Sequence, residues 1–308
     1  MNLKKPKFWD YEKPNLYAYL LFPISIIVRF ISFLNTKLKI KNTKIKTICV
    51  GNIYIGGTGK TSLAIKINEI LNKRGINSCF IKKFYTNQTD EQKILEKKGR
   101  LFLSSKRSEA IKEAEKENYD MAIFDDGLQD KTINYDSSFV CFNTINWIGN
   151  GMTIPAGPLR EKISNLKKYK NIFLNGNLEN IDNLKRKILE INSNLKIFVG
   201  VYEPLNLQEF DKNENYLVFS GIGNHETFIA MLKASGLKIL KNLEFPDHYN
   251  YNQNDIKTIL DEANNLKCKI ITTEKDYLRT EIISLNKIKY IKSELRIIDE
   301  EKLLQTIL

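Results

Sequence analysis

Apolar residues follow two kinds of pattern along the chain. Short, nearly continuous apolar runs predict buried strands, and stretches with apolar residues three and four positions apart predict helices. The predicted strands include residues 47–50, 119–124, 170–176, 196–202, 216–223, 268–273 and 287–292. The predicted helices include residues 62–72, 178–191, 226–235, 254–266 and 300–307. This alternation of strands and helices is typical of an α/β fold.

The first long apolar stretch differs from these elements. It runs from Asn15 to Leu34, contains one charged residue, Arg29, and is interrupted by Pro23. Its length is close to the ~20 residues that a membrane-spanning helix needs. Lysines flank it on both sides, which favours a monotopic helix in an anionic membrane surface over a spanning one. A buried core helix and a cleaved signal peptide are the alternatives, although no cleavage motif follows the stretch.

Length and composition narrow the class of protein. With 308 residues, 42% of them hydrophobic, the chain is expected to be globular with two cores. Its net charge of +12 suits nucleic acid, an anionic membrane surface or a phosphorylated substrate. The cysteines lie far apart in apolar runs, which indicates reduced core residues of a cytosolic protein rather than a zinc site or disulfide framework. They are Cys49, Cys79, Cys141 and Cys268.

The segment VGNIYIGGTGKT, residues 50–61, has most of a phosphate-binding loop. It stands between a predicted strand and a predicted helix, so backbone N–H groups at the helix start can converge on phosphate oxygens. Lys60 is placed to reach the β- and γ-phosphates, and the Thr61 hydroxyl to bind Mg²⁺. Tyr54 stands where the usual pattern G-x-x-x-x-G-K-[ST] has glycine, so a glycine-rich turn without chemistry is the alternative. The predicted nucleotide-binding residues are Tyr54, Ile55, Gly56, Gly57, Thr58, Gly59, Lys60 and Thr61.

Two adjacent carboxylates follow the predicted strand at 119–124. Asp125 and Asp126 stand where a phosphate loop needs an acidic partner for Mg²⁺, at the end of a nearby strand. Paired aspartates also occur at turns and helix caps. With the phosphate loop upstream, a metal role is favoured.

Six segments occur in series along the chain. They are VGNIYIGGTGKTS (50–62), DDGLQ (125–129), GNGMTIPAGPLRE (149–161), SGIGN (220–224), FPDHY (245–249) and TTEKD (272–276). Together and in this order they resemble the tetraacyldisaccharide 4′-kinase family of lipid A biosynthesis. That family also lacks the first glycine of the loop, which makes Tyr54 part of a variant phosphate loop.

The resemblance implies a domain plan of two α/β/α lobes with the active site in the cleft between them. Residues 1–40 would form the N-terminal membrane-associating helix and its basic flanks. Residues 41–167 would form a P-loop NTPase-like kinase lobe, and residues 168–308 a smaller C-terminal α/β lobe that closes the cleft.

The resemblance also implies an activity. The protein would use ATP and Mg²⁺ to phosphorylate the 4′-hydroxyl of a lipid A disaccharide 1-phosphate. Its partners would be this lipid A disaccharide precursor and the anionic membrane surface, with no nucleic acid. It would be a peripheral, monotopic protein at the cytoplasmic face of the bacterial inner membrane.

Site residues carry over position by position. Asp90, in the match to the family's G-D-E-P stretch, would be the base, and His248 of FPDHY would orient its carboxylate. Lys60 would complete the catalytic set. The implied metal residues are Thr61, Asp125, Asp126 and Glu91. Lys275 of TTEKD is interpreted either as a contact to substrate phosphate or as part of an exposed helix cap.

The sequence departs from the family pattern at three places. Asp130 stands where the family usually has histidine, Lys82–Tyr85 replaces S-R-G-Y, and the linker to the Asp90 segment is shorter. A non-catalytic nucleotide-binding relative of the kinase is therefore one alternative function. A membrane-bound NTPase switch of the partition type is another, although Ile55 stands where such switches carry a second lysine.

Overall fold

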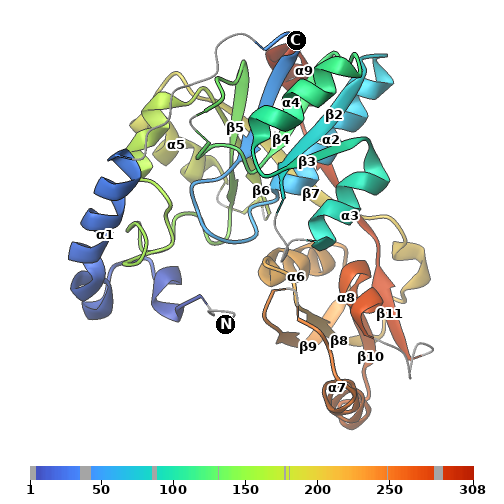
Figure 1. The fold of residues 1–308 in the computed structure, drawn as a ribbon. Coiled ribbons are helices and arrows are strands. Elements are labelled where there is room, and N and C mark those ends of the chain that lie inside the picture. The colour runs from blue at the N-terminus through green and yellow to red at the C-terminus, as the bar shows by residue number, and fades with distance from the viewer. Residues whose placement is uncertain are drawn as a thin grey trace. The chain divides into compact units, whose positions relative to one another are not determined.

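The structure is a computed structural model that describes residues 5–34, 43–84, 89–130, 132–176, 178–179, 181–247, 249–280 and 287–308. For residues 32–34, 89 and 90 the description covers the backbone alone. The chain divides into two compact units, whose elements are labelled in Figure 1. The larger unit contains residues 5–175, 179–200 and 297–308, and the smaller unit contains residues 176–178 and 201–296.

The larger unit contains most of a sheet of eight described strands in the order β12-β7-β6-β5-β1-β4-β2-β3; residues 201–204 of β7 and 293–296 of β12 are counted in the smaller unit. All neighbouring strands from β7 to β3 are parallel. The bounds are β1 Lys46–Gly51, β2 Ser78–Lys83, β3 Leu101–Ser104, β4 Met121–Asp125, β5 Ser137–Asn143, β6 Asn171–Asn175, β7 Lys196–Pro204 and β12 Ser293–Ile297. The central strands β1 and β4 are buried along almost their whole length, which explains their continuous apolar runs.

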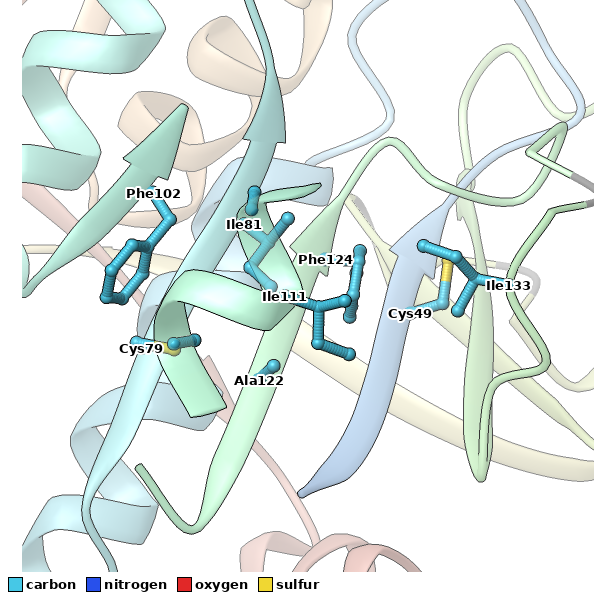
Figure 2. Packing of buried hydrophobic residues seen from close by; sticks show 10 residues of the cluster. Cys49, Cys79, Ile81, Phe102, Ile111, Ala122, Phe124 and Ile133 are labelled. Carbon is cyan, nitrogen blue, oxygen red and sulfur yellow. The ribbon is translucent and has the colours of Figure 1, made fainter. Parts of the chain in front are cut away.

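Helices cover both faces of this sheet. Successive strand residues point to opposite faces. On β2, Cys79 packs in a cluster with Ala110, Ile111 and Ala114 of α4 (Figure 2), whereas the neighbouring Ser78 donates a hydrogen bond to Asn68 of α2. The described helices of the larger unit are η1 Lys7–Asp10, α1 Leu16–Leu34, α2 Lys60–Lys73, α3 Thr89–Lys98, α4 Arg107–Lys116, η2 Ile163–Lys168, α5 Ile181–Ile191 and α9 Glu300–Ile307.

The smaller unit repeats this plan on a smaller scale. Its described strands form a parallel sheet in the order β11-β10-β8-β9. Val218 of β8 packs in one cluster with Phe228 of α6, and its neighbour Phe219 packs in another with Ile259 of α7. The bounds are η3 Leu207–Glu209, β8 Asn215–Ser220, α6 His225–Ala234, β9 Lys238–Glu244, α7 Gln253–Asn265, β10 Lys269–Thr273, α8 Glu274–Arg279 and β11 Ile288–Ile291.

The predicted α/β fold is confirmed, with two differences in detail. The strands predicted at 170–176 and 196–202 were expected in the smaller lobe, but as β6 and β7 they extend the larger sheet. An apolar run identifies a buried strand without saying which sheet it joins. Cys268, predicted as a core residue, is half-buried, whereas Cys49, Cys79 and Cys141 are buried.

The N-terminal apolar stretch forms α1, Leu16–Leu34. Ala18 and Ser25 are fully buried, and the Ser25 hydroxyl donates to the Thr153 carbonyl at 2.9 Å and accepts from Ala156 N–H at 3.2 Å. Much of the rest of the helix is exposed although it is apolar. The exposed residues are Leu16, Tyr17, Tyr19, Leu20, Phe22, Ile24, Ile26, Ile27, Val28, Phe30 and Ile31. Among the described residues, no helix reaches the length and apolarity that crossing a membrane requires.

Candidate active site

The phosphate loop, residues 51–61, leads from β1 into α2. Gly59, which precedes the first residue of α2, adopts a left-handed conformation with φ 73°, and Gly56 has φ 128°. Residues with a Cβ rarely adopt such angles, so both glycines are required by the path of the loop. The loop delivers Lys60 and Thr61 to the first turn of α2, where free backbone N–H groups and the positive end of the helix dipole favour an anion.

Tyr54 has a structural role that explains why it replaces glycine. Its side chain is almost completely buried, and its hydroxyl donates to the Asp10 carboxylate of η1 at 2.8 Å. Its backbone forms a bridge with Leu159, next to the hydrogen bond of 2.9 Å from Ile55 N–H to the Pro158 carbonyl. The entrance of the loop is therefore tied to η1 and to the PAGPLRE segment.

The centre of the loop is held by two buried asparagines. The side-chain amide of Asn52 donates to the Thr58 hydroxyl at 2.8 Å, and that of Asn175, at the end of β6, donates to the Thr58 carbonyl at 2.5 Å. Thr58 is buried at this point. These contacts hold the loop in one conformation, and such preorganisation lowers the entropic cost of binding.

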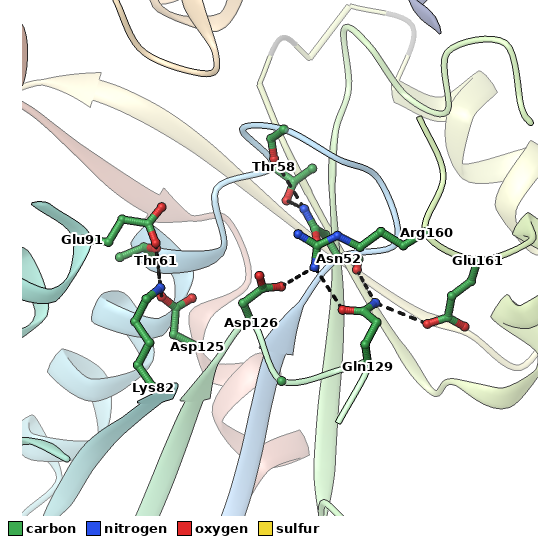
Figure 3. Close-up of polar contacts among 12 residues, drawn as sticks. Asn52, Thr58, Thr61, Lys82, Glu91, Asp125, Asp126, Gln129, Arg160 and Glu161 are labelled. Carbon is green, nitrogen blue, oxygen red and sulfur yellow. Dashed lines mark hydrogen bonds and ion pairs between the residues drawn. The ribbon is translucent and has the colours of Figure 1, made fainter. Parts of the chain in front are cut away.

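Four residues meet where β2 and β4 end beside the loop, and we call them the carboxylate cluster: Thr61, Lys82, Glu91 and Asp125. The Thr61 hydroxyl donates to Asp125 Oδ2 at 3.1 Å (Figure 3). Lys82 Nζ donates to the same Oδ2 at 2.6 Å and to Glu91 Oε2 at 2.6 Å. Lys82 and Asp125 are buried, so the two carboxylate charges raise the pKa of the Lys82 ammonium although burial alone would lower it.

Asp126 forms a second polar group beside this cluster. It has a positive φ of 58°, and its carboxylate accepts from Arg160 Nη1 at 2.8 Å. Burial alone would raise the pKa of this carboxyl, but the charges of Lys60 and Arg160 outweigh burial and lower it. Arg160 also donates to Gln129 at 3.0 Å, and Gln129 in turn donates to the Asn52 carbonyl at 2.9 Å. Of the predicted acidic pair, Asp125 is therefore paired with Lys82 and Asp126 with Arg160.

The cluster offers oxygen donors that fit Mg²⁺, the metal that the sequence implies. Asp125 Oδ1 is buried and has no hydrogen-bond partner among the described residues, while Oδ2 of the same carboxylate is shared by Thr61 and Lys82. Carboxylate and hydroxyl oxygens are the ligands that Mg²⁺ takes in proteins. Within the described part of the chain, no three acidic, histidine or cysteine side chains are already gathered as a metal centre.

For two catalytic residues implied by the resemblance, the structure describes no side chain. Asp90 lies in the first turn of α3, and only its backbone is described. His248 lies outside the described residues. The proposed pairing of these two side chains therefore stays a prediction. Glu91, implied near the metal, is described, and its carboxylate forms an ion pair with Lys82.

The sequence did not assign roles to Lys82 and Arg160. Lys82 was noted only because the segment Lys82–Tyr85 differs from the family's S-R-G-Y. Arg160 was noted only as one residue of the PAGPLRE segment. The structure places the first between Asp125 and Glu91 and the second on Asp126. Parallel strands end at the same edge of a sheet, so a charged residue at the end of β2 was the available signal for Lys82.

Asp130, which replaces the family's histidine, is accommodated locally. Its carboxylate accepts from the Thr132 hydroxyl at 2.6 Å and from Arg107 at 3.4 Å. Burial would raise the pKa of Asp130, but these hydrogen bonds and the Arg107 charge lower it. The added negative charge is therefore balanced by neighbouring groups.

Two motifs in the smaller unit have structural roles. In TTEKD, Thr273 caps α8: its hydroxyl donates to Asp276 Oδ2 at 2.6 Å and accepts from Asp276 N–H at 3.1 Å. The buried Asp276 also accepts from Gly221 N–H of the SGIGN turn at 3.0 Å, while Lys275 is exposed. His225 begins α6, and its ring contacts Ser220 and Asn242 at 2.7 and 3.1 Å.

A parallel sheet whose first strand leads through a glycine-rich loop into a helix, with an aspartate ending the neighbouring strand, defines a P-loop nucleotide-binding protein. The chain belongs to the tetraacyldisaccharide-1-P 4′-kinase family, whose family model matches residues 17–100 and 86–308. The resemblance inferred from the six segments is thereby confirmed.

Relatives and a solved structure agree with this assignment. The chain is 60% identical over 303 residues to the tetraacyldisaccharide 4′-kinase of Pelagibacter ubique, covering 98% of this chain and 96% of that one. It is 35% identical over 302 residues to the enzyme of the same name from Rickettsia canadensis, covering 91% and 89%. The crystal structure of LpxK from Aquifex aeolicus in complex with ATP shares the fold, with a TM-score of 0.62, 21% identity and coverage of 94% and 96%.

Proposed function

We propose that this chain is a tetraacyldisaccharide 4′-kinase, which transfers the γ-phosphate of ATP to the 4′-hydroxyl of a tetraacyldisaccharide 1-phosphate, a lipid A precursor. The observation that carries this proposal is the 60% identity to a kinase of that name over nearly the full length of both chains. The ordered phosphate loop and the acidic end of β4 supply the chemistry that such a transfer needs.

The phosphate loop is the proposed nucleotide site. Backbone N–H groups from Tyr54 to Thr61 bind the phosphates, and the Lys60 ammonium neutralises charge on the transferred group. Thr61 and Asp125, with Asp126 and Glu91 nearby, hold Mg²⁺, which when bound neutralises phosphate charge and orients the transferred group. Phosphoryl transfer of this kind depends mostly on positioning and charge neutralisation.

The acceptor hydroxyl needs help because a sugar hydroxyl is a poor nucleophile. Asp90 takes its proton as the attack proceeds, and His248 orients the Asp90 carboxylate and adjusts its basicity. The support for these two roles is the match of the segments at 89–92 and 245–249 to the family pattern.

The substrate is a lipid, and α1 is the proposed membrane anchor. Ile27 and Phe30 are 58% and 61% exposed on a helix that is apolar on most of its surface. A patch of this kind is unfavourable in water and typical of a membrane contact. We place α1 in one leaflet of an anionic membrane, at the cytoplasmic face of the inner membrane, where the basic residues before and after it contact lipid headgroups.

The test is a transfer assay with purified protein, γ-labelled ATP, Mg²⁺ and the disaccharide 1-phosphate in mixed micelles. Labelled lipid that forms only when the acceptor, the protein and Mg²⁺ are all present supports the kinase. ATP hydrolysis without acceptor, coupled to dimerisation, supports a switch instead. ATP binding without transfer or hydrolysis supports a non-catalytic relative. Acceptor lacking a free 4′-hydroxyl is the matched control and should remain unlabelled.

A further inference from the structure

Lys82 occupies an unusual position for a lysine. It stands at the end of β2, with a side chain only 2% exposed, and its ammonium contacts two carboxylates at 2.6 Å each. Lysine is rarely buried in this way unless it is paired. Its side chain lies among the oxygens that are proposed for Mg²⁺, as Figure 3 shows.

The two carboxylate oxygens of Asp125 differ in their hydrogen-bond partners. Oδ2 is shared by the Lys82 ammonium and the Thr61 hydroxyl, whereas Oδ1 is buried without a partner among the described residues. A cation at Oδ1 would therefore lie on the same carboxylate as the Lys82 ammonium. In a buried site, repulsion between two such charges is much stronger than in water.

We propose that Lys82 is a resident cation of the carboxylate cluster, which offsets part of the negative charge of Asp125 and Glu91 when no nucleotide is bound and so makes divalent-metal binding at Asp125 depend on nucleotide. The inference rests on the proposed magnesium role of Asp125. The Lys82 ammonium already offsets one of the two carboxylate charges, and it lies on Asp125 Oδ2, so a free divalent ion at Oδ1 meets its repulsion and gains little there. A nucleotide bound at the loop adds several negative charges beside the cluster, and these offset the repulsion between the metal and Lys82.

Replacing Lys82 by methionine tests this directly. Lys82→Met keeps the length of the side chain but removes its charge, so the ammonium no longer competes with a metal for Asp125. Mn²⁺ titration followed by electron paramagnetic resonance measures binding without nucleotide. We expect the nucleotide-free variant to bind Mn²⁺ about tenfold or more tightly than the wild type. Lys98→Met, on the exposed end of α3, loses the same charge in the same unit and should leave the affinity unchanged.

Further variants keep the inference testable if Lys82→Met is unstable. Lys82→Gln removes the charge but keeps hydrogen-bond donors for both carboxylates. If metal-free Lys82→Met is unfolded by circular dichroism, Mn²⁺ should restore its fold, because the metal replaces the missing cation. Adding Asp125→Asn to either variant should abolish the gained binding.

Outcomes against the inference are distinct from failure of the proposed function. Affinities of Lys82→Met and Lys82→Gln within twofold of the wild type, or weaker, would overturn it. So would a gain in binding that survives Asp125→Asn, or an unfolded Lys82→Met that Mn²⁺ does not restore. The magnesium role itself fails separately, if the wild-type protein transfers phosphate in the presence of chelator and no added divalent ion.

Discussion

At the residue scale, the site depends on charges that neutralise one another across strand ends. The positions of Lys60 and Thr61 at the start of α2, and of Asp125 and Asp126 at the end of β4, were predictable because each lies in a short motif next to a strand. Lys82 and Arg160 were not, because their ion pairs depend on which strands are neighbours and on how a distant loop folds back. Sequence spacing alone does not contain that information.

Lys60 is the residue whose loss should affect transfer most. Lys60→Ala is expected to lower kcat by at least about 10²–10³-fold, because one preorganised positive group at the transferred phosphate is removed. The fold should remain intact, since Lys60 is only half-buried at the start of α2. The measurements are the transfer assay and the melting temperature. Lys66→Ala, six residues further along α2, is the control, and near-normal transfer by Lys60→Ala would exclude the proposed loop.

Asp130 should contribute pH-dependent stability. Its carboxyl pKa is below the ordinary value of 3.8, so its contribution is complete above that pH and is lost as the pH falls through the folded-state pKa. Asp130→Asn is therefore expected to lower the free energy of unfolding by about 1–3 kcal/mol at pH 7, with a deficit that shrinks below pH ~4. Urea unfolding at pH 7, 5 and 3.5 measures this. Asp182→Asn, 90% exposed on α5, should show no such deficit.

At the element scale, strands and helices were predictable from periodicity, whereas their partners were not. The strand–loop–helix unit of β1 and α2 is local, so its pattern was sufficient. The placement of β6 and β7 depends on pairing between strands that are distant in sequence, and both described sheets contain apolar parallel strands that such a run could join. The contact between η1 and the phosphate loop was likewise invisible to pattern analysis.

That contact predicts coupling between Tyr54 and Asp10. Tyr54→Phe removes the hydroxyl that donates to Asp10, and Asp10→Ala removes the carboxylate oxygen that accepts this hydrogen bond. In a double-mutant cycle we expect a coupling free energy of about 0.5–1.5 kcal/mol from urea unfolding, because one partly buried hydrogen bond is lost in both single variants. Additive effects of the two substitutions would contradict an energetic role for this contact.

The exposed apolar surface of α1 predicts membrane binding. Ile27→Asp and Phe30→Asp should each weaken sedimentation with anionic vesicles by about tenfold or more, because a charge replaces an apolar group that is proposed to enter the membrane. Their melting temperatures should change little, since both side chains are exposed. Leu240→Asp, 56% exposed in the smaller unit, is the matched control. Unchanged sedimentation of both α1 variants would refute the anchor.

At the scale of the whole molecule, the proposed catalytic residues come from both units. Lys60, Asp90 and Asp125 belong to the larger unit, and His248 falls in the sequence range of the smaller one. The two histidines of the chain have different proposed roles, because His225 is assigned to folding and His248 to catalysis.

The two histidine variants should have opposite effects. His248→Ala is expected to lower kcat by about 10²–10³-fold, because Asp90 loses the group that orients it, with little effect on the melting temperature. His225→Ala should lower the melting temperature, since it leaves Ser220 and Asn242 without a buried partner, but leave kcat of the folded protein unchanged. An effect of His248→Ala on KM alone would assign that residue to substrate binding. A fall in kcat for His225→Ala at a temperature where it is folded would place the chemistry elsewhere in the smaller unit.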